Sequence, residues 1–202
     1  MTNAIISIAA FIVVIVVHEL SHGLAAYWMG DNTAKDAGRL TLNPLAHADP
    51  VGSILLPFLL VISSSPVIFG WAKPVPINPL NFKSPRKGLF ITSLAGPGSN
   101  FVLAAVFALI FKTGIFAPHS IMWKFLLSGV MVSLVLGVFN LVPIPPLDGS
   151  NIVLAVLPKK MMRYYAMLER YGFIILIAML YLGLLNKVIF PFVSFFSKIL
   201  LG

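Results

Sequence analysis

The sequence predicts an all-α polytopic membrane protein, with four to six membrane segments, a re-entrant hairpin and short strands in the loops. Of the 202 residues, 59% are hydrophobic and only 10% are charged. A soluble domain carries about a quarter charged residues, so this chain has too few to cover a surface that faces water. The mean hydropathy of +0.99 agrees with this conclusion. We therefore expect the chain to lie in the lipid bilayer.

The net charge of +8 fits the same fold class. Basic residues lie in short segments between the apolar stretches, where they set the orientation of a membrane protein. Aromatic and basic residues do not alternate in a patch, so we expect no nucleic-acid partner. The chain contains no cysteine, which excludes disulfides and thiolate metal ligands.

The first apolar segment covers about 4–29 and lacks the basic start and the cleavage pattern of a signal peptide, so we expect a retained helix. Four more segments cover 51–69 and about 88–111, 121–141 and 171–185. A last stretch, 188–201, has a proline within it and is shorter than the roughly 20 residues of a membrane span. We expect that stretch at the membrane interface or over the bundle.

The segments that link these stretches contain turn and strand signals. Within the polar linker 30–50, residues 38–42 predict a short strand. The linker 70–87 predicts extended chain, because its prolines keep the residues before them out of the helical region. Residues 71–78 have two interpretations: a strand edge that binds an unfolded substrate segment, or an interfacial loop anchored by Trp71.

The sequence His-Glu-Leu-Ser-His at 18–22 matches the H-E-x-x-H pattern of zinc peptidases. His18 and His22 are four residues apart, so a helix places both imidazoles on one face, where they can bind one metal ion. Glu19 can accept a proton from a metal-bound water and act as the general base. Ionisable residues are costly inside an apolar segment, so they indicate a functional site. The alternative is a helix end whose polar residues meet lipid headgroups.

A catalytic zinc ion takes three protein ligands and keeps one position open. The other histidines and acids are His47, His119, Asp31, Asp36, Asp49, Asp148 and Glu169. Asp148 is the strongest candidate, because it follows the proline-rich run 143–146 directly after an apolar span. Broken backbone at membrane depth occurs only where protein buries it or where it lines a wet cavity. The alternative is a plain loop in which Asp148 caps a helix that begins near Ser150.

Three motifs in this order resemble the site-2 protease family of intramembrane zinc metalloproteases. They are the HELSH sequence, Gly-Pro-Gly-Ser-Asn at 96–100, and Asn-x-x-Pro-x-Pro-Pro-Leu-Asp-Gly at 140–149. The resemblance covers about 4–157. It implies one Zn²⁺ per chain, held by His18, His22 and Asp148, with Glu19 as general base. It also implies that Asn140 lies beside the site, where it orients the substrate or stabilises the oxyanion.

The resemblance further implies a substrate that is itself a transmembrane helix, cut within or near the membrane. The chain has no room for a PDZ domain or a CBS pair, so we expect a minimal member. It would be a single metalloprotease domain over 1–202, with a catalytic core at about 4–157 and C-terminal helices at about 158–202. The alternative functions are a membrane zinc-binding or transport protein, or an inactive relative that binds helices without cutting them. A transporter would carry acids or histidines along several spans, and here the other spans have essentially none.

The proposed ligands also constrain the topology. HELSH lies towards the C-terminal end of the first span, and Asp148 follows the end of the fourth segment. If all four segments cross, these ends lie on opposite sides, so we expect 51–69 to enter the membrane and return. The HELSH side then carries ten basic residues. They are Lys35, Arg39, Lys73, Lys83, Arg86, Lys87, Lys159, Lys160, Arg163 and Arg170.

Lys112, Lys124 and Lys187 fall on the other side, and this distribution places the site near the cytoplasmic face. We expect a multi-pass protein of a prokaryotic cell membrane.

Other polar residues and glycines have both structural and functional interpretations. His47 can approach the zinc or gate access to it, but a structural role in its loop is the more frequent case. Asn100 can hydrogen-bond between helices or lie next to the zinc ligands. Gly96 and Gly98 are expected to allow close helix packing.

Overall fold

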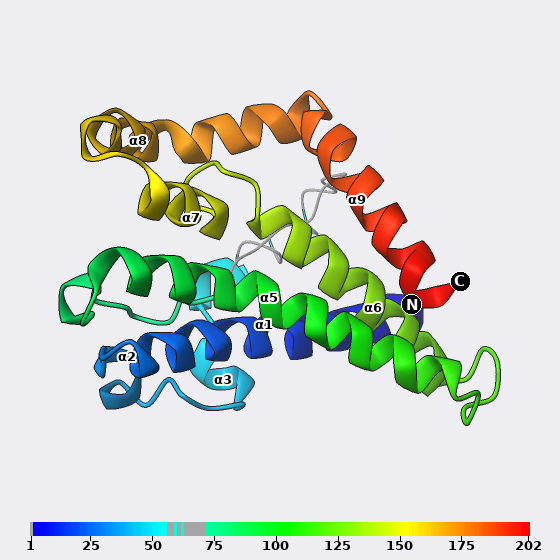
Figure 1. Ribbon diagram of the computed structural model, residues 1–202. Helices are drawn as coiled ribbons and strands as arrows, with labels where there is room; N and C mark the ends of the chain where they lie inside the picture. Colours follow the sequence, from blue (N-terminus) through cyan, green and yellow to red (C-terminus); the bar gives the residue numbers. More distant parts are fainter. Residues whose placement is uncertain (1, 56–58, 60–61, 63–71) are drawn as a thin grey trace.

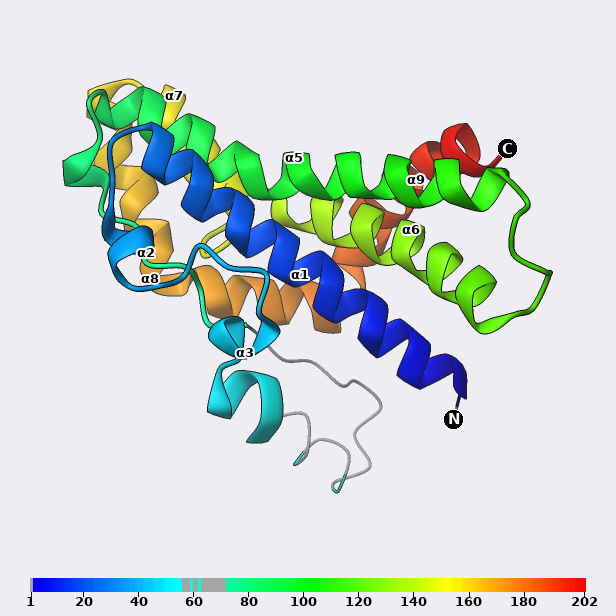
Figure 2. The same ribbon diagram turned by 90° about the horizontal axis from the view of Figure 1, so that it is seen from below.

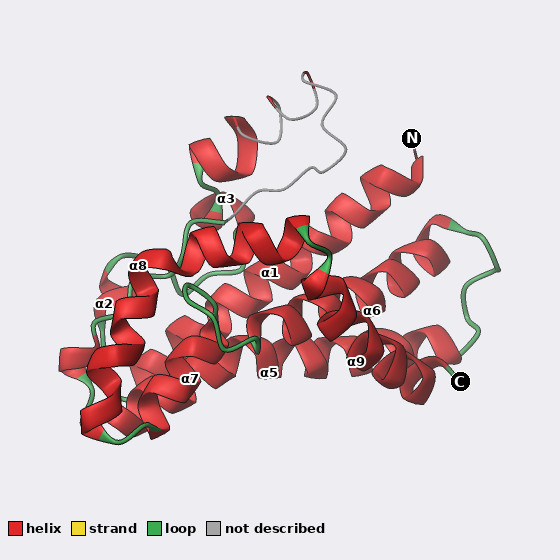
Figure 3. Cartoon of the chain, turned by 90° about the horizontal axis from the view of Figure 1, so that it is seen from above, coloured by secondary structure: helices red, strands yellow, loops and turns green. Residues whose placement is uncertain are grey.

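Helices form every regular element that the structure describes. This computed structural model describes residues 2–55, 59, 62 and 72–202, and none of these residues lies in a β-strand (Figure 3). Among the described residues, four helices are long and apolar enough to cross a membrane. They are α1 (Thr2–Trp28), α5 (Pro85–Lys112), α6 (Ile121–Asn140) and α9 (Leu184–Leu201). The prediction of an all-α polytopic membrane protein is therefore confirmed.

Helices α1, α5 and α6 pack against one another and form the centre of the bundle (Figure 1). Gly129 of α6 faces the ring of Phe107 on α5, and a side chain at position 129 would overlap that ring. The absence of a side chain there lets the two helices approach closely, as small residues do in membrane bundles. Large apolar side chains on the outer faces of the bundle are exposed, as expected of surfaces that face lipid.

The C-terminal part of the described chain adds two helices, α7 (Asp148–Val156) and α8 (Lys159–Tyr181), before α9. Gly183, with φ of +67°, turns the chain between α8 and α9. Helix α9 buries Leu185, Ile189 and Val193 and packs on α6. The stretch 188–201 therefore covers the bundle, but the prediction that it is too short for a span was wrong, because its helix begins at Leu184.

The linker after α1 contains short elements beside the C-terminal half of that helix (Figure 2). These are α2 (Thr33–Asp36), α3 (Pro44–His47), the π-helical turn η1 (Pro50–Leu55) and the 3₁₀ turn η2 (Pro79–Asn81). The predicted strand at 38–42 is not formed. The N–H groups of Gly38 and Arg39 bond back to the Lys35 and Ala34 carbonyls, which closes a turn in place of a ladder. Residues 72–78 lie in no regular element, and Asn78 has an extended backbone. Pro79–Asn81 form η2 and α5 begins at Pro85, so the prediction of extended chain over 70–87 was wrong for these parts.

The two ends of this linker meet at one end of the bundle. The Lys83 N–H donates to the Met29 carbonyl at 3.1 Å, so α5 begins where α1 ends. Helices α1 and α6 run the same way, and α5 runs opposite to both (Figure 1). The C-terminal ends of α1 and α6 therefore lie on the same side, as the proposed ligands require. Most of the predicted re-entrant segment 51–69 lies outside the described residues.

Candidate metal centre

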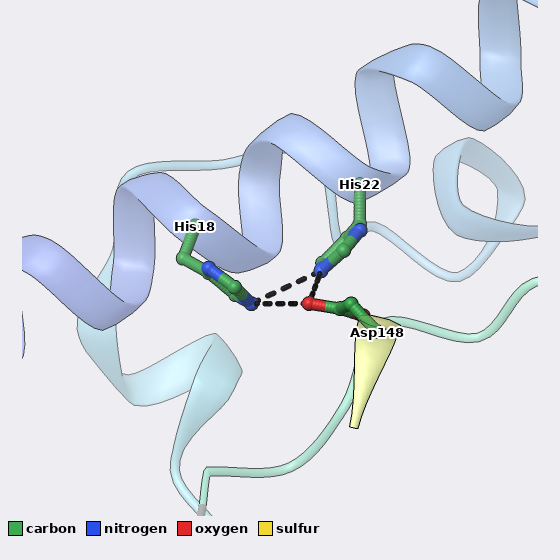
Figure 4. A group of neighbouring side chains, drawn as sticks. All are labelled: His18, His22 and Asp148. Atoms are coloured by element: carbon green, nitrogen blue, oxygen red, sulfur yellow. Dashed lines mark hydrogen bonds and ion pairs between the residues drawn. The ribbon is translucent and has the colours of Figure 1, made fainter. Parts of the chain in front are cut away.

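Three side chains from distant parts of the sequence converge at this end of the bundle. His18 and His22 project from one face of α1, and Asp148 reaches them from the first residue of α7 (Figure 4). Asp148 Oδ2 lies 3.3 Å from His18 Nε2 and 3.2 Å from His22 Nε2. The two Nε2 atoms are 3.0 Å apart. The group can hold one metal ion.

The spacing and chemistry of these atoms fit a zinc ion. Zinc–ligand bonds of about 2.0–2.1 Å in a tetrahedron place neighbouring donors roughly 3.3 Å apart. Asp148 Oδ2 is buried, and no hydrogen-bond donor among the described residues satisfies it. When both Nε2 atoms are unprotonated, the lone pairs of the two nitrogens and of Asp148 Oδ2 point towards one another and repel. A cation bound between them compensates this repulsion. Two nitrogens and one oxygen, with a fourth position open, are the donor set of a catalytic zinc site.

A backbone carbonyl fixes the ring of His22. Its Nδ1–H donates to the Thr92 carbonyl of α5 at 2.7 Å. A proton on Nδ1 leaves the lone pair of the neutral ring on Nε2, which faces the other ligands. Hydrogen bonds of this kind orient metal-binding histidines and strengthen them as ligands.

Asn100 of α5 contacts the ring of His18 in the way that the Thr92 carbonyl contacts the ring of His22. Its side chain is fully buried, and its Nδ2 lies 3.0 Å from His18 Nδ1. A metal on Nε2 leaves the proton on Nδ1, so the amide must be turned over to present its oxygen, which is buried and has no partner among the described residues, to the ring. Asn100 thus lies next to a proposed zinc ligand, one of the two roles considered for it.

The Gly-Pro-Gly-Ser-Asn motif lets α5 pass close to the histidines. A side chain at position 96 would overlap the rings of His22 and His18. Pro97 lies inside the helix, and Ser99 Oγ donates to the Gly96 carbonyl at 2.7 Å. The close-packing prediction is therefore confirmed for Gly96. It is wrong for Gly98, whose surroundings hold no atom within 4 Å of an added side chain.

The proline-rich run places Asp148 at the site. Residues 141–147 form turns between α6 and α7. Gly149 lies against the Leu141 and Val142 carbonyls, and a side chain there would overlap both. This close return of the chain brings the start of α7 back towards α1. The Asp148 carboxylate faces the histidines, so the alternative of a helix-capping residue in a plain loop is not supported.

A cleft of about 380 Å³ opens beside the three donors. Glu19 lies in its wall, and Glu19 Oε2 accepts a hydrogen bond from the Val75 N–H at 2.9 Å. Asn140 also lines the cleft, and its Nδ2–H donates to the Leu136 carbonyl of its own helix at 3.0 Å. The structure thus brings all five predicted site residues to one place.

Two histidines are not part of the centre. His47 is buried in α3, where its Nε2–H donates to the Thr41 carbonyl at 2.9 Å, a contact within its own linker. His119 has a positive φ and contacts the Trp123 ring at the start of α6. The partners that sequence reasoning missed, Thr92 and Val75, act through backbone atoms. The residue types in the sequence do not indicate such contacts, because every residue has a backbone carbonyl and every residue except proline has a backbone N–H.

Together, the fold and the site define a helical membrane protein with a metal centre built into one of its spans. Comparison with known proteins agrees. The sequence model of one family, described as Peptidase family M50, matches residues 110–182, a range that contains Asp148. YwhC of Bacillus subtilis, named as a candidate zinc metalloprotease, is 38% identical over 201 residues. This match covers 93% of the chain and 85% of YwhC.

Two further relatives bear the name Rip2 and are likewise named as candidate zinc metalloproteases. The Mycolicibacterium smegmatis protein is 29% identical over 192 residues, covering 95% of this chain and 73% of that relative. The Mycobacterium tuberculosis protein is 29% identical over 180 residues, covering 89% and 68%. No solved structure matches the chain.

The chain therefore belongs to peptidase family M50, the site-2 protease family. It is a zinc-dependent metalloendopeptidase that takes one zinc ion, and it lies in the membrane as a multi-pass protein. This assignment favours the peptidase over the alternative of a membrane zinc-binding or transport protein.

Proposed function

We propose that this peptidase hydrolyses a peptide bond within or near the transmembrane segment of membrane-protein substrates. His18, His22 and Asp148 hold the zinc ion, and Glu19 is the general base. The observation that carries the proposal is the position of the donors. His18 and His22 are buried in the apolar helix α1, which has the length and hydropathy of a membrane span. A metal centre there serves a substrate that lies in the bilayer.

The side chains support hydrolysis as follows. Zinc, when bound, supplies an electrophile that acidifies a water molecule and polarises the substrate carbonyl. A Glu19 carboxylate oxygen accepts a proton from the attacking water, whose oxygen adds to the carbonyl carbon. The carbon–nitrogen bond then breaks, and Glu19 returns the proton to the leaving nitrogen.

Asn140 is proposed to contact the substrate carbonyl. One N–H of its amide is bonded to the Leu136 carbonyl, which fixes the side chain at the wall of the cleft. The second N–H stays available for the oxygen that gains negative charge during attack.

The proposed substrate is a transmembrane helix that unwinds locally. Carbonyls inside a helix are bonded to their own chain and shielded, so the bond to be cut must leave the helix first. The cleft beside Glu19 has polar groups that can replace the lost hydrogen bonds. We also propose that residues 1–202 act as one metalloprotease domain, with the core at about 4–157 and the helices of about 158–202 beside it.

We further propose a prokaryotic cell membrane, with the site near the cytoplasmic face. The end of the bundle that holds the site is also the end with most of the basic residues. Cytoplasmic loops are enriched in lysine and arginine. The relatives named above all come from bacteria, which supports the choice of membrane.

Fragment analysis of membranes tests this function. Cells that express wild type are compared with cells that express Glu19→Gln, and membrane-protein fragments are identified by mass spectrometry. We expect fragments found only with wild type, with new ends inside or next to predicted transmembrane segments. Equal fragments from both strains would contradict the role of Glu19, and new ends confined to soluble domains would contradict cleavage in the membrane.

A further inference from the structure

One peptide N–H in the linker is aimed at the proposed general base. In the segment Lys73–Pro76, Pro74 and Pro76 have no N–H, so Val75 carries the backbone donor between them. That donor bonds to Glu19 Oε2 at 2.9 Å. The Val75 side chain is buried, and it also faces Gly23 on the next turn of α1.

This segment is held from the side by Arg39. The guanidinium Nη2 donates to the Lys73 carbonyl at 2.7 Å and to the Pro74 carbonyl at 3.2 Å. Arg39 is only 8% exposed, so these bonds are made away from bulk water. The Pro74 carbonyl belongs to the same planar peptide group as the Val75 N–H that reaches Glu19, and the Lys73 carbonyl belongs to the peptide group before it. Moving these two carbonyls therefore moves that N–H.

Further contacts fix the two ends of the segment. The Lys73 N–H donates to the His47 carbonyl at 2.9 Å, and the Asn78 N–H donates to Asp31 Oδ2 at 2.7 Å. Without Arg39, the stretch between these anchors loses its side support. Pro74 and Pro76 have no N–H, so between the two anchors only Val75, which is bonded to Glu19, and Ile77 carry backbone donors.

We propose that Arg39 is a positioning residue for the general base: it holds the Lys73–Pro76 segment so that the Val75 N–H fixes the Glu19 carboxylate beside the metal ligands. This role rests on the proposed function of Glu19. A carboxylate that is held in place populates the orientation needed for proton transfer more often than a mobile one. Displacement of a catalytic group by about 1 Å can reduce turnover roughly 100-fold. Arg39 itself touches neither the ligands nor Glu19 among the contacts of the described residues.

Amide hydrogen exchange tests the contact without any need for activity. A peptide that spans 73–77 carries amide hydrogens only on Lys73, Val75 and Ile77. We expect exchange in this peptide to be faster in Arg39→Met and in Glu19→Ala than in wild type, with zinc removed and with zinc bound. The matched control is Lys35→Met, an exposed cation in the same linker. Unchanged exchange in Arg39→Met would overturn the proposal.

Turnover of a fluorescein-labelled casein probe in detergent separates the possible roles of Arg39. We expect Arg39→Met to lower kcat by about 10-fold or more, with KM unchanged within about twofold and one zinc per chain retained. Arg39→Lys, which keeps a donor, should recover part of the loss. A loss that follows zinc content, or a rise in KM with kcat unchanged, would overturn the positioning role.

A second pair of variants removes the contact from the other side. Val75→Pro deletes the N–H, whereas Val75→Ala keeps it. We expect Val75→Pro to resemble Arg39→Met, and the double variant to lose little more than the worse single one, because both act through one hydrogen bond. Additive losses would count against the proposal.

Glu19→Gln, measured beside these variants, separates the two proposals. Wild-type turnover in Glu19→Gln would overturn the proposed function and the positioning role together. Loss of turnover in Glu19→Gln with wild-type turnover in Arg39→Met would overturn the positioning role alone.

Discussion

Gly96 lies where α5 passes the two histidines of α1. A methyl group at this position would overlap the rings of His22 and His18. We expect Gly96→Ala to lower zinc affinity by about 10- to 100-fold, the usual effect of disturbing groups that orient ligands. Zinc titration of the purified protein measures this, with Gly98→Ala as the matched control, since position 98 has open space. Equal affinities in both variants would contradict the close approach.

Substitution of Asn100 tests whether its contact orients the ring of His18. Its amide is the contact that holds Nδ1, so Asn100→Leu, which has a similar volume and no polar group, should free the ring. We expect roughly 10- to 100-fold weaker zinc binding. Ser99→Ala is the control, because Ser99 bonds only to the Gly96 carbonyl of its own helix. Wild-type zinc affinity in Asn100→Leu would show that the ring needs no such partner.

At the scale of elements, Asp31 joins α1 to the start of α5. Its fully buried carboxylate accepts bonds from the Thr33 N–H and hydroxyl, the Asn78 N–H and the Asn81 amide. Burial raises the pKa of Asp31, but these hydrogen bonds outweigh it and hold the pKa below its ordinary value. The bonds therefore favour the ionised form in the folded protein.

The lowered pKa of Asp31 sets a direction for the pH dependence of stability. Its contribution is fully present above the unfolded pKa of about 3.9 and is lost as the pH falls through the lower folded value. We expect Asp31→Asn to destabilise the protein at neutral pH by about 1–3 kcal/mol.

Thermal unfolding in detergent should show that the difference in stability between wild type and Asp31→Asn becomes smaller as the pH falls into the acid range. Asp36→Asn, at an exposed carboxylate of α2, is the control. A gap that stays constant down to low pH would show that the charge of Asp31 is not responsible.

The sequence predicts the three side chains of the proposed metal centre, because helix spacing pairs the histidines and because ionisable groups are costly in apolar surroundings. His18 and His22 share a helix face, and Asp148 stands out as an acid after broken backbone. The supporting contacts are harder to foresee. The Thr92 carbonyl and the Val75 N–H belong to the backbone, so only the path of the chain shows where they point.

Among the elements, hydropathy predicts the spans but not all of their boundaries. Helix α9 begins four residues before the expected stretch, because the turn at Gly183 separates it from α8. The expected strand at 38–42 fails for a different reason. Its alternating pattern lacks a partner strand, and its first amides close the turn after α2.

At the scale of the whole molecule, the proposed topology places the C-terminal ends of α1 and α6 on the cytoplasmic side. The chain has no cysteine, so single-cysteine variants can be labelled without background. In intact cells, a membrane-impermeant maleimide should label Thr113→Cys and Ala117→Cys, in the loop between α5 and α6. It should label Lys35→Cys and Lys160→Cys only after the cells are opened. Labelling of Lys35→Cys and Lys160→Cys from opposite sides would contradict the topology.

The central claim is a single zinc ion held by two histidines and one aspartate. The zinc K-edge X-ray absorption spectrum of the zinc-loaded protein tests it most directly. We predict two imidazole ligands, with the remaining ligands being oxygen atoms at about 2.0–2.2 Å. The oxygen donors should come from Asp148 and a water molecule, so the oxygen contribution should fall in Asp148→Ala. A spectrum with three or more imidazoles, or one unchanged by Asp148→Ala, would contradict the account.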